Sequence, residues 1–218
     1  MISTLPAGKK SYKEHNCDQG TDEWYELRRQ YPLTASNAQA ISAQGAGLDT
    51  LVFTKMSEKY SSEPFQEHVS SRHIDRGNEL EEHAREIYEL ETGETVREVG
   101  FVTDKSISHY GGASPDGLVG EEGLIEIKCF EDVKYFKMII DHNKGMKFDI
   151  EKKYYWQMQQ QMLFTGRPWC DFVAYNPNFK QSLLIQRVEA NKDDQEKIIG
   201  GLKKGEQLIK DIEKNYNK

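Results

Sequence analysis

Apolar residues recur at helical spacing in several segments of the chain. The longest such pattern covers residues 76–91, ends at Gly93 and places four apolar residues on one stripe: Leu80, Ala84, Ile87 and Tyr88. Shorter patterns predict helices over residues 21–29, 48–60, 132–140 and 152–164.

Two further helical segments carry signals of their own. Ser36 is a good N-cap residue for a helix that reaches about Ile41. Near the C-terminus, apolar residues keep helical spacing from Ile198 to Ile212, but the Gly200–Gly201 pair falls inside this segment. We therefore expect the C-terminal helical region to be interrupted at these glycines.

After Gly93 the pattern changes to short β-strands separated by turn residues. The strands are expected over residues 97–102, 118–119, 123–129, 170–175 and 182–188. A chain of 218 residues with this mixture of elements predicts an α/β (α+β) fold. We expect a single domain over residues 1–218, with flexible ends at 1–18 and 215–218.

The composition is that of a folded protein with a hydrophilic surface. Hydrophobic residues make up 37% of the chain and charged residues 30%, and the aromatic share of 11% supplies bulky core material. No apolar run reaches the roughly 18 residues of a transmembrane helix, and the N-terminus lacks the apolar core of a signal peptide. We expect no membrane association and a cytoplasmic location.

The net charge of −7 is concentrated in one segment. Residues 76–99 contain eight glutamates and three arginines, so the rest of the chain is close to neutral. The acidic net charge does not indicate nonspecific binding of nucleic acid over the protein surface. Any channel that binds a polyanion must therefore have its own local basic residues.

Cysteine usage gives no sign of a cross-linked or metal-binding framework. Cys17, Cys129 and Cys170 are odd in number and far apart, which fits neither a disulfide scaffold nor an iron–sulfur motif. We expect reduced, mostly buried thiols.

A charged pair on the apolar strand 123–129 is the first candidate for chemistry. Strand alternation puts Glu126 and Lys128 on one face, where an exposed salt bridge is the simplest interpretation. Asp116, however, lies ten residues earlier, in a Pro-Asp-Gly turn on the strand expected to pair with this one. Two carboxylates and an ammonium would then meet at one corner of a hairpin.

These groups suit metal-assisted hydrolysis of a phosphodiester. The carboxylates of Asp116 and Glu126, with the backbone carbonyl of Ile127 between them, offer the hard oxygen ligands that Mg²⁺ prefers. Lys128 can orient or deprotonate a metal-bound water and offset phosphate charge. The hairpin alone leaves catalysis and a structural ion pair as alternatives.

The helix over residues 76–91 adds a third carboxylate. Glu81 lies on the flank of the apolar stripe, where a half-buried carboxylate needs a partner. Either a metal shared with Asp116 and Glu126 or an arginine from elsewhere would supply one. The other glutamates of this helix are expected on a solvated face: Glu79, Glu82, Glu86 and Glu89.

Six short motifs together carry a family resemblance. They are GTDEWYELR at 20–28, Thr34-Ala35-Ser36, Arg76-Gly77-x-x-x-Glu81, Ser114-Pro115-Asp116-Gly117, Ile125-Glu126-Ile127-Lys128-Cys129 and Tyr154-x-x-Gln157. In order and approximate spacing, residues 20–190 resemble the phage lambda-type exonucleases, the YqaJ-like viral recombinases of the PD-(D/E)xK superfamily. The resemblance implies a restriction-endonuclease-like core, with a central mixed β-sheet flanked by helices.

The resemblance assigns roles around the metal. It implies that Glu81, Asp116 and Glu126 are acidic ligands and that Lys128 is the active-site lysine. Gln157 matches a glutamine on the helix that lines the site, although spacing alone favours a polar helix face shared with residues 159–161. The implied cofactor is Mg²⁺, with two ions possible and Mn²⁺ able to substitute.

The resemblance also implies a site for the DNA end. Arg28, Ser36 and Ser114 match a pocket for the terminal 5′-phosphate, and the N-H groups of a helix capped by Ser36 would attract that phosphate. Alternatively, Ser36 only caps and Arg28 is a surface residue. Lys134 is a candidate for a further charge in the pocket. Ile74 matches an apolar wedge that separates the terminal base pair, with a core isoleucine as the alternative.

The implied function is an alkaline-type deoxyribonuclease of a phage or prophage in a bacterial host. It would be a Mg²⁺-dependent 5′→3′ exonuclease that digests one strand from a duplex DNA end and leaves a 3′ single strand for recombination. The resemblance further implies a homotrimer and a single-strand annealing protein as partner. A restriction or repair endonuclease and a non-catalytic DNA-end-binding module are the alternatives.

Two departures from the family pattern are visible. Residues 43–47 lack the lysines that the family carries near its active site, so no second basic residue is assigned there. The four cysteines of iron–sulfur relatives are also missing, and no cluster is inferred.

Overall fold

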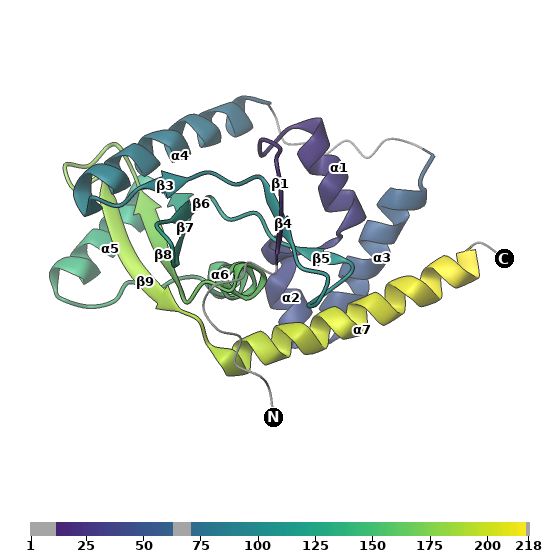
Figure 1. Cartoon of the computed structure of the whole chain (residues 1–218). Helices are drawn as coiled ribbons and strands as arrows, with labels where there is room; N and C mark the ends of the chain where they lie inside the picture. The colour runs from purple at the N-terminus through teal and green to yellow at the C-terminus, as the bar shows by residue number, and fades with distance from the viewer. Residues whose placement is uncertain (1–11, 63–70, 217–218) are drawn as a thin grey trace.

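The computed structural model describes residues 12–62 and 71–216, and in the helix Ser71–Thr92 (α4) it describes side chains from residue 79 onward. Its core contains a mixed five-stranded β-sheet (Figure 1). The strand order is β3-β6-β7-β8-β9. These strands span Val96–Arg97, Gly117–Val119, Gly123–Cys129, Trp169–Tyr175 and Leu183–Glu189. β7 and β8 pair in parallel and the other neighbours are antiparallel, which confirms the predicted mixed sheet.

Helices cover both faces of this sheet. On one face, α4 (Ser71–Thr92) packs Ala84 and Tyr88 of the predicted apolar stripe against β7 and β8. On the other face, α5 (Asp132–Asn143) and α6 (Lys152–Thr165) contribute Tyr135 and Tyr154 to the core around Phe172. The remaining α-helices are α1 (Asp22–Gln30), α2 (Ala38–Ala43), α3 (Ala46–Tyr60) and α7 (Lys192–Tyr216).

Strand β7 shows the predicted alternation. Leu124 enters the core that contains Phe172, whereas Ile125 and Ile127 enter the core beneath α4. Because helices cover both faces of the sheet, Glu126, on the same face of β7 as Leu124, is fully buried. The strand therefore carries a carboxylate into the interior of the molecule.

A buried arginine fixes the turn between β6 and β7. Nη1 of Arg167, which follows α6, donates to three carbonyl oxygens of this turn, at 3.1, 3.1 and 2.6 Å: those of Val119, Gly120 and Gly123. The guanidinium thereby ties the hairpin to the connection from α6 to β8.

Two small β-sheets were not predicted. β1 (Lys13–His15) pairs with β4 (Phe101–Thr103), and β2 (Leu33–Thr34) pairs with β5 (Gly111–Gly112). The single strand expected over residues 97–102 is divided between β3 and β4. Strands of two or three residues are too short for alternation to reveal them.

The prediction that Ser36 caps a helix is wrong. Ser36 lies inside the 3-10 turn Ala35–Asn37, and α2 begins after Asn37 without a side-chain cap hydrogen bond. The exposed hydroxyl instead accepts a hydrogen bond from Nη2 of Arg28 at 3.1 Å. Ser36 therefore meets Arg28 through a tertiary contact.

The three cysteines are free, but only Cys170 is buried. Cys17 is half-buried and Cys129 is exposed at the end of β7, so the expectation of mostly buried thiols is wrong. In the part of the chain that the structure describes, every helix is too short or too polar to span a lipid bilayer.

Helix α7 continues through Gly200–Gly201, and the predicted interruption is wrong. A Cβ atom at Gly201 would lie 1.9 Å from the carbonyl oxygen of Ile41, at the interface with α2. Gly201 thus lets α7 and α2 approach closely, although glycine has a lower helix propensity than other residues.

We predict that Gly201→Ala lowers the free energy of unfolding by about 1–3 kcal/mol, because overpacking against a backbone carbonyl displaces α2 from α7. Gly200→Ala is the matched control. A Cβ there meets Nε2 of Gln44, the end of a long side chain that can shift, at 2.8 Å, and alanine favours the helix by about 1 kcal/mol. Urea unfolding followed by circular dichroism measures both variants, and equal stabilities would contradict the packing explanation.

Candidate active site

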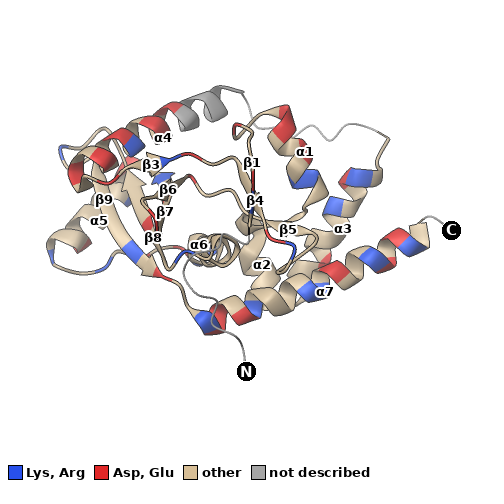
Figure 2. Cartoon of the chain, in the orientation of Figure 1, with Lys and Arg blue, Asp and Glu red and all other residues tan. Residues whose placement is uncertain are grey.

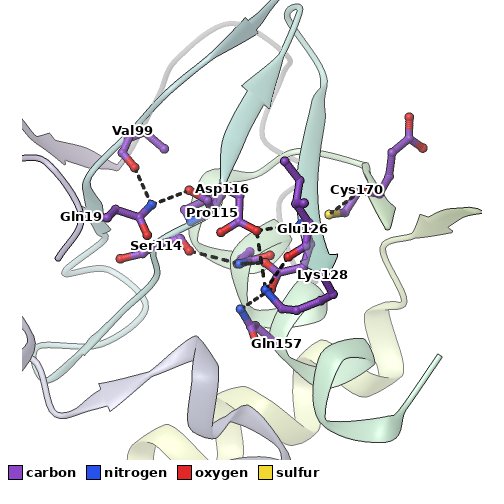
Figure 3. Close-up of polar contacts among 12 residues, drawn as sticks. Gln19, Val99, Ser114, Pro115, Asp116, Glu126, Lys128, Gln157 and Cys170 are labelled. Carbon is purple, nitrogen blue, oxygen red and sulfur yellow. Dashed lines mark hydrogen bonds and ion pairs between the residues drawn. The ribbon is translucent and has the colours of Figure 1, made fainter. Parts of the chain in front are cut away.

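The β6–β7 hairpin brings the predicted catalytic groups together, as Figure 3 shows. Asp116 immediately precedes β6, and its Oδ2 accepts a hydrogen bond from the backbone N-H of Ile127 at 2.7 Å. Nζ of Lys128 lies 2.6 Å from Oε1 of Glu126 and 3.6 Å from Oδ2 of Asp116. It also donates to the carbonyl oxygen of Ile127 at 2.8 Å. The expected corner of two carboxylates and one ammonium is present.

Two glutamines of α6 complete the surroundings of Glu126. Nε2 of Gln157 donates to Oε1 at 2.6 Å, so this side chain lies at the candidate site and not on a solvated helix face, whereas its role in a reaction stays a prediction. Nε2 of Gln161 donates to Oε2 at 2.7 Å. Sequence reasoning missed Gln161, although its spacing of four residues from Gln157 places both on one side of the helix.

Two carboxylates of the site, those of Glu81 and Glu126, have a raised pKa. Burial, followed by the nearby charge of Asp116, raises the pKa of Glu81 to about 7. The same two causes, in the same order, raise the pKa of Glu126 to about 7, against the opposing effect of Lys128. The pKa of Lys128 is raised, because the attraction of Asp116 and Glu126 exceeds the penalty of burial. The site concentrates more negative charge than one lysine neutralises.

The donor atoms around Nζ of Lys128 fit a divalent cation. Glu126 Oε1, the Ile127 carbonyl and Asp116 Oδ2 are hard oxygens, and all three were predicted as ligands. In the described part of the chain, no group of three His, Cys, Asp or Glu side chains is arranged to hold a metal ion by itself. The ammonium of Lys128 lies between these oxygens and supplies positive charge to the acidic cluster.

A cavity of about 400 Å³ adjoins the acidic cluster, with Glu81 and Asp116 in its wall. The half-buried position predicted for Glu81 is confirmed. Arginine was the alternative partner for Glu81, and Arg85, which lines the same cavity, stabilises the charge of Glu81 as well as pairing with Glu98 at 2.8 Å. Glu81 is thus close to both Asp116 and Arg85, and the shared cation stays a prediction.

The three residues expected to bind a terminal phosphate are linked through Trp24. The guanidinium of Arg28 lies over the Trp24 ring, 4.4 Å from its centroid, and donates to Ser36. Nε1 of Trp24 donates to Oγ of Ser114 at 2.9 Å. Trp24 was missed as a site residue; its position one helical turn before Arg28 was the available signal.

Other predicted residues have different surroundings. Lys134 forms an ion pair with Glu151, and its Nζ lies 4.6 Å from the ring centroid of Phe130, so its place in the phosphate pocket stays a prediction. Ile74 belongs to the part of α4 whose side chains lie outside the described residues, and the wedge also stays a prediction.

Acidic residues are concentrated along α4, as the colouring of Figure 2 shows. Glu79, Glu82 and Glu86 are exposed there, as predicted. Glu89 is different, because it is half-buried and its Oε1 accepts a hydrogen bond from the backbone N-H of Val96 at 2.6 Å. The expectation of a solvated side chain is wrong for Glu89, which instead holds the start of β3.

Residues 23–168 match the family model of the YqaJ-like viral recombinase domain. The chain belongs to this family. No match was found among curated proteins.

Solved structures support the placement in the YqaJ-like family. An alkaline exonuclease from Laribacter hongkongensis, LHK-Exo, is 32% identical with a TM-score of 0.72, and the match covers 90% of this chain and 98% of that one. LHK-Exo in complex with dAMP gives the same identity and coverage, with a TM-score of 0.69. A phage-related exonuclease from Haemophilus somnus 129PT, 15% identical over 83% of this chain and 96% of that one, has a TM-score of 0.55 and shares the fold. The restriction-endonuclease-like core expected from the sequence is confirmed.

Proposed function

We propose that this YqaJ-like chain is a Mg²⁺-dependent 5′→3′ exonuclease that digests one strand of duplex DNA from its end. The observation that carries the proposal is the position of Lys128 between the carboxylates of Asp116 and Glu126. The similarity to LHK-Exo, an alkaline exonuclease, supports the same activity. The remaining 3′ single strand would be handed to a single-strand annealing protein for recombination.

The residues of the hairpin divide the work of hydrolysis. Asp116, Glu126 and the carbonyl of Ile127 would hold Mg²⁺, with Glu81 as a further carboxylate nearby. When bound, Mg²⁺ supplies a Lewis acid that lowers the pKa of water and offsets phosphate charge. We expect Mn²⁺ to substitute, because it accepts the same oxygen ligands.

Two further side chains of the site, those of Lys128 and Gln157, have supporting roles. The ammonium of Lys128 can hold the attacking water or a phosphate oxygen by hydrogen bonds and compensates the carboxylates of the site. Gln157 holds Oε1 of Glu126 in place.

Recognition of the 5′ end would come from the Arg28 side of the site. Arg28 can offer two N-H donors to a terminal phosphate, and Ser36 and Ser114 can offer hydroxyl groups. Ser114 is only two residues from Asp116, so the pocket and the metal ligands share one short segment. A phosphate held in the pocket would present the neighbouring phosphodiester to the carboxylates, and this favours digestion that starts from a 5′ end.

A single assay tests reaction, polarity and metal together. Linear duplexes labelled at one end are incubated with Mg²⁺ or with EDTA, and closed circular DNA serves as the substrate without ends. We expect loss of nucleotides from the 5′ end in Mg²⁺ only. Cleavage of closed circles at a similar rate would contradict an exonuclease.

Substitutions of the hairpin residues test the chemistry. Asp116→Ala, Glu126→Ala and Lys128→Ala should each lower the cleavage rate about a thousandfold, because several kcal/mol of transition-state stabilisation is lost. Single-turnover digestion of end-labelled duplex measures this, with circular dichroism to verify folding.

The matched controls are Glu79→Ala and Glu82→Ala, exposed carboxylates of the helix that carries Glu81. Their rates should stay within about twofold of the wild-type rate, since replacement of a solvent-exposed side chain usually changes the free energy by no more than about 0.5 kcal/mol. A comparable loss in these controls, or near-normal cleavage by Asp116→Ala, would refute the assignment.

Arg28→Ala should slow digestion of 5′-phosphorylated ends by about 10- to 100-fold, which corresponds to the 1.5–3 kcal/mol of a charge-assisted hydrogen bond. Digestion of 5′-hydroxyl ends should change much less, because the phosphate contact is absent there. Arg29→Ala is the control, since Arg29 is exposed on the same helix and pairs with Glu26 at 3.0 Å. Equal slowing on both kinds of end would mean that Arg28 acts only in folding.

A homotrimeric ring is part of the proposal. With a net charge of −7 the chain has little nonspecific attraction for DNA, so continuous digestion requires retention by a closed ring. Helix α5 supports contact between copies, because it exposes three apolar residues at helical spacing, with exposures of 87%, 52% and 38%: Val133, Phe136 and Ile140.

Light scattering should give a mass near three times 25.2 kDa. Phe136→Glu should lower this mass, because it places a charge in the apolar surface of α5. Phe53→Glu, at a residue of similar exposure on α3, should not. A wild-type monomer at working concentration would refute the ring and leave the proposed chemistry intact.

A further inference from the structure

Gln161 is a fully buried amide that contacts two parts of the active-site hairpin. Its Nε2 donates to Oε2 of Glu126 at 2.7 Å and to the carbonyl oxygen of Ser114 at 3.3 Å. Glu126 belongs to β7, whereas Ser114 precedes Asp116 on the other side of the hairpin. One amide group therefore ties together the segments that carry both hairpin carboxylates.

The two oxygens of Glu126 have different partners. Oε1 receives hydrogen bonds from Lys128 and Gln157, each at 2.6 Å, and it belongs to the oxygen cluster around the ammonium. Oε2 accepts a hydrogen bond from Gln161, which lies one helical turn after Gln157 on α6. A carboxylate with one oxygen engaged in this way presents the other oxygen in a fixed direction.

We propose that Gln161 is a positioning residue, which holds Oε2 of Glu126 so that Oε1 would be directed toward the cation, and which sets the spacing between Glu126 and Asp116. This inference rests on the proposed function, because it concerns how the hairpin holds Mg²⁺. Gln161 does not touch the cation or the DNA, and it acts through Glu126 and through the backbone of Ser114.

An amide suits this position better than other donors. A lysine or arginine would pair with Glu126 and reduce the negative charge that attracts a cation, whereas a neutral amide orients the carboxylate and leaves its charge. Serine and threonine are too short to bridge from α6 to Glu126. Partners that orient metal ligands in this way typically contribute about 10- to 100-fold to metal affinity.

The neighbouring Gln160 provides a matched control. It is also fully buried in α6, and its Nε2 donates to the carbonyl oxygens of Leu33 and Gly112 at 2.9 and 3.2 Å. Replacement of either glutamine by methionine removes its amide group and keeps a side chain of similar size. Of these two glutamines, Gln161 contacts a carboxylate of the site and Gln160 contacts backbone carbonyls.

The test measures Mn²⁺ binding by isothermal titration calorimetry, without DNA, in the wild type, Gln161→Met and Gln160→Met. We expect Gln161→Met to weaken Mn²⁺ binding about 10- to 100-fold, and Gln160→Met to stay within about threefold of the wild type. Steady-state digestion should show a lower kcat for Gln161→Met at fixed Mn²⁺ and an unchanged KM for DNA ends. Unchanged Mn²⁺ affinity in Gln161→Met, or equal weakening in both variants, would overturn the inference.

Gln161→Asn covers the case in which methionine prevents folding. Asparagine keeps a polar amide and fits the space, but its donor falls short of Glu126, so Mn²⁺ binding should weaken in the same direction. Normal affinity in Gln161→Asn would also overturn the inference. A wild-type protein that neither binds Mn²⁺ nor cleaves DNA would overturn the proposed function, and this inference with it.

Discussion

The burial of one carboxylate, that of Glu126, is the constraint on which the centre of this structure depends. An ionised group without solvent contact costs several kcal/mol unless charges and hydrogen bonds compensate it. Lys128, Gln157 and Gln161 provide this compensation from β7 and α6. The packing of α6 over the sheet and the arrangement of the site are thus one structural solution, and neither can be altered without the other.

Much of this arrangement could be predicted because it is local. The boundaries of β7, Gly123 and Cys129, agree between prediction and structure, since a turn and an apolar alternating segment define the strand. A hairpin brings residues that are ten positions apart in the sequence close together, so the proximity of Asp116 and Glu126 could be predicted. The position of Glu81 near Asp116 required a second inference, from the flank of an amphipathic helix, and the structure agrees with it.

Features that depend on distant contacts could not be predicted. Gln161 stands in a run of glutamines that looks solvent-exposed, and its burial follows from segments far away in the chain. Trp24 fits an ordinary apolar helix position, and its hydrogen bond to Ser114 spans 90 residues. The same limit explains Gly201, because a glycine that interrupts a helix in isolation is required here by the approach of α2.

The contacts of Arg167 have a consequence for the time at which the hairpin is fixed during protein synthesis. The ribosome delivers Asp116, Glu126 and Lys128 well before Arg167, whose side chain closes the turn that positions them. The glutamines of α6 also emerge after the hairpin. A nascent chain therefore carries its acidic groups for some time without the contacts that arrange them. The hairpin is therefore fixed late in synthesis, when the connection into β8 has folded.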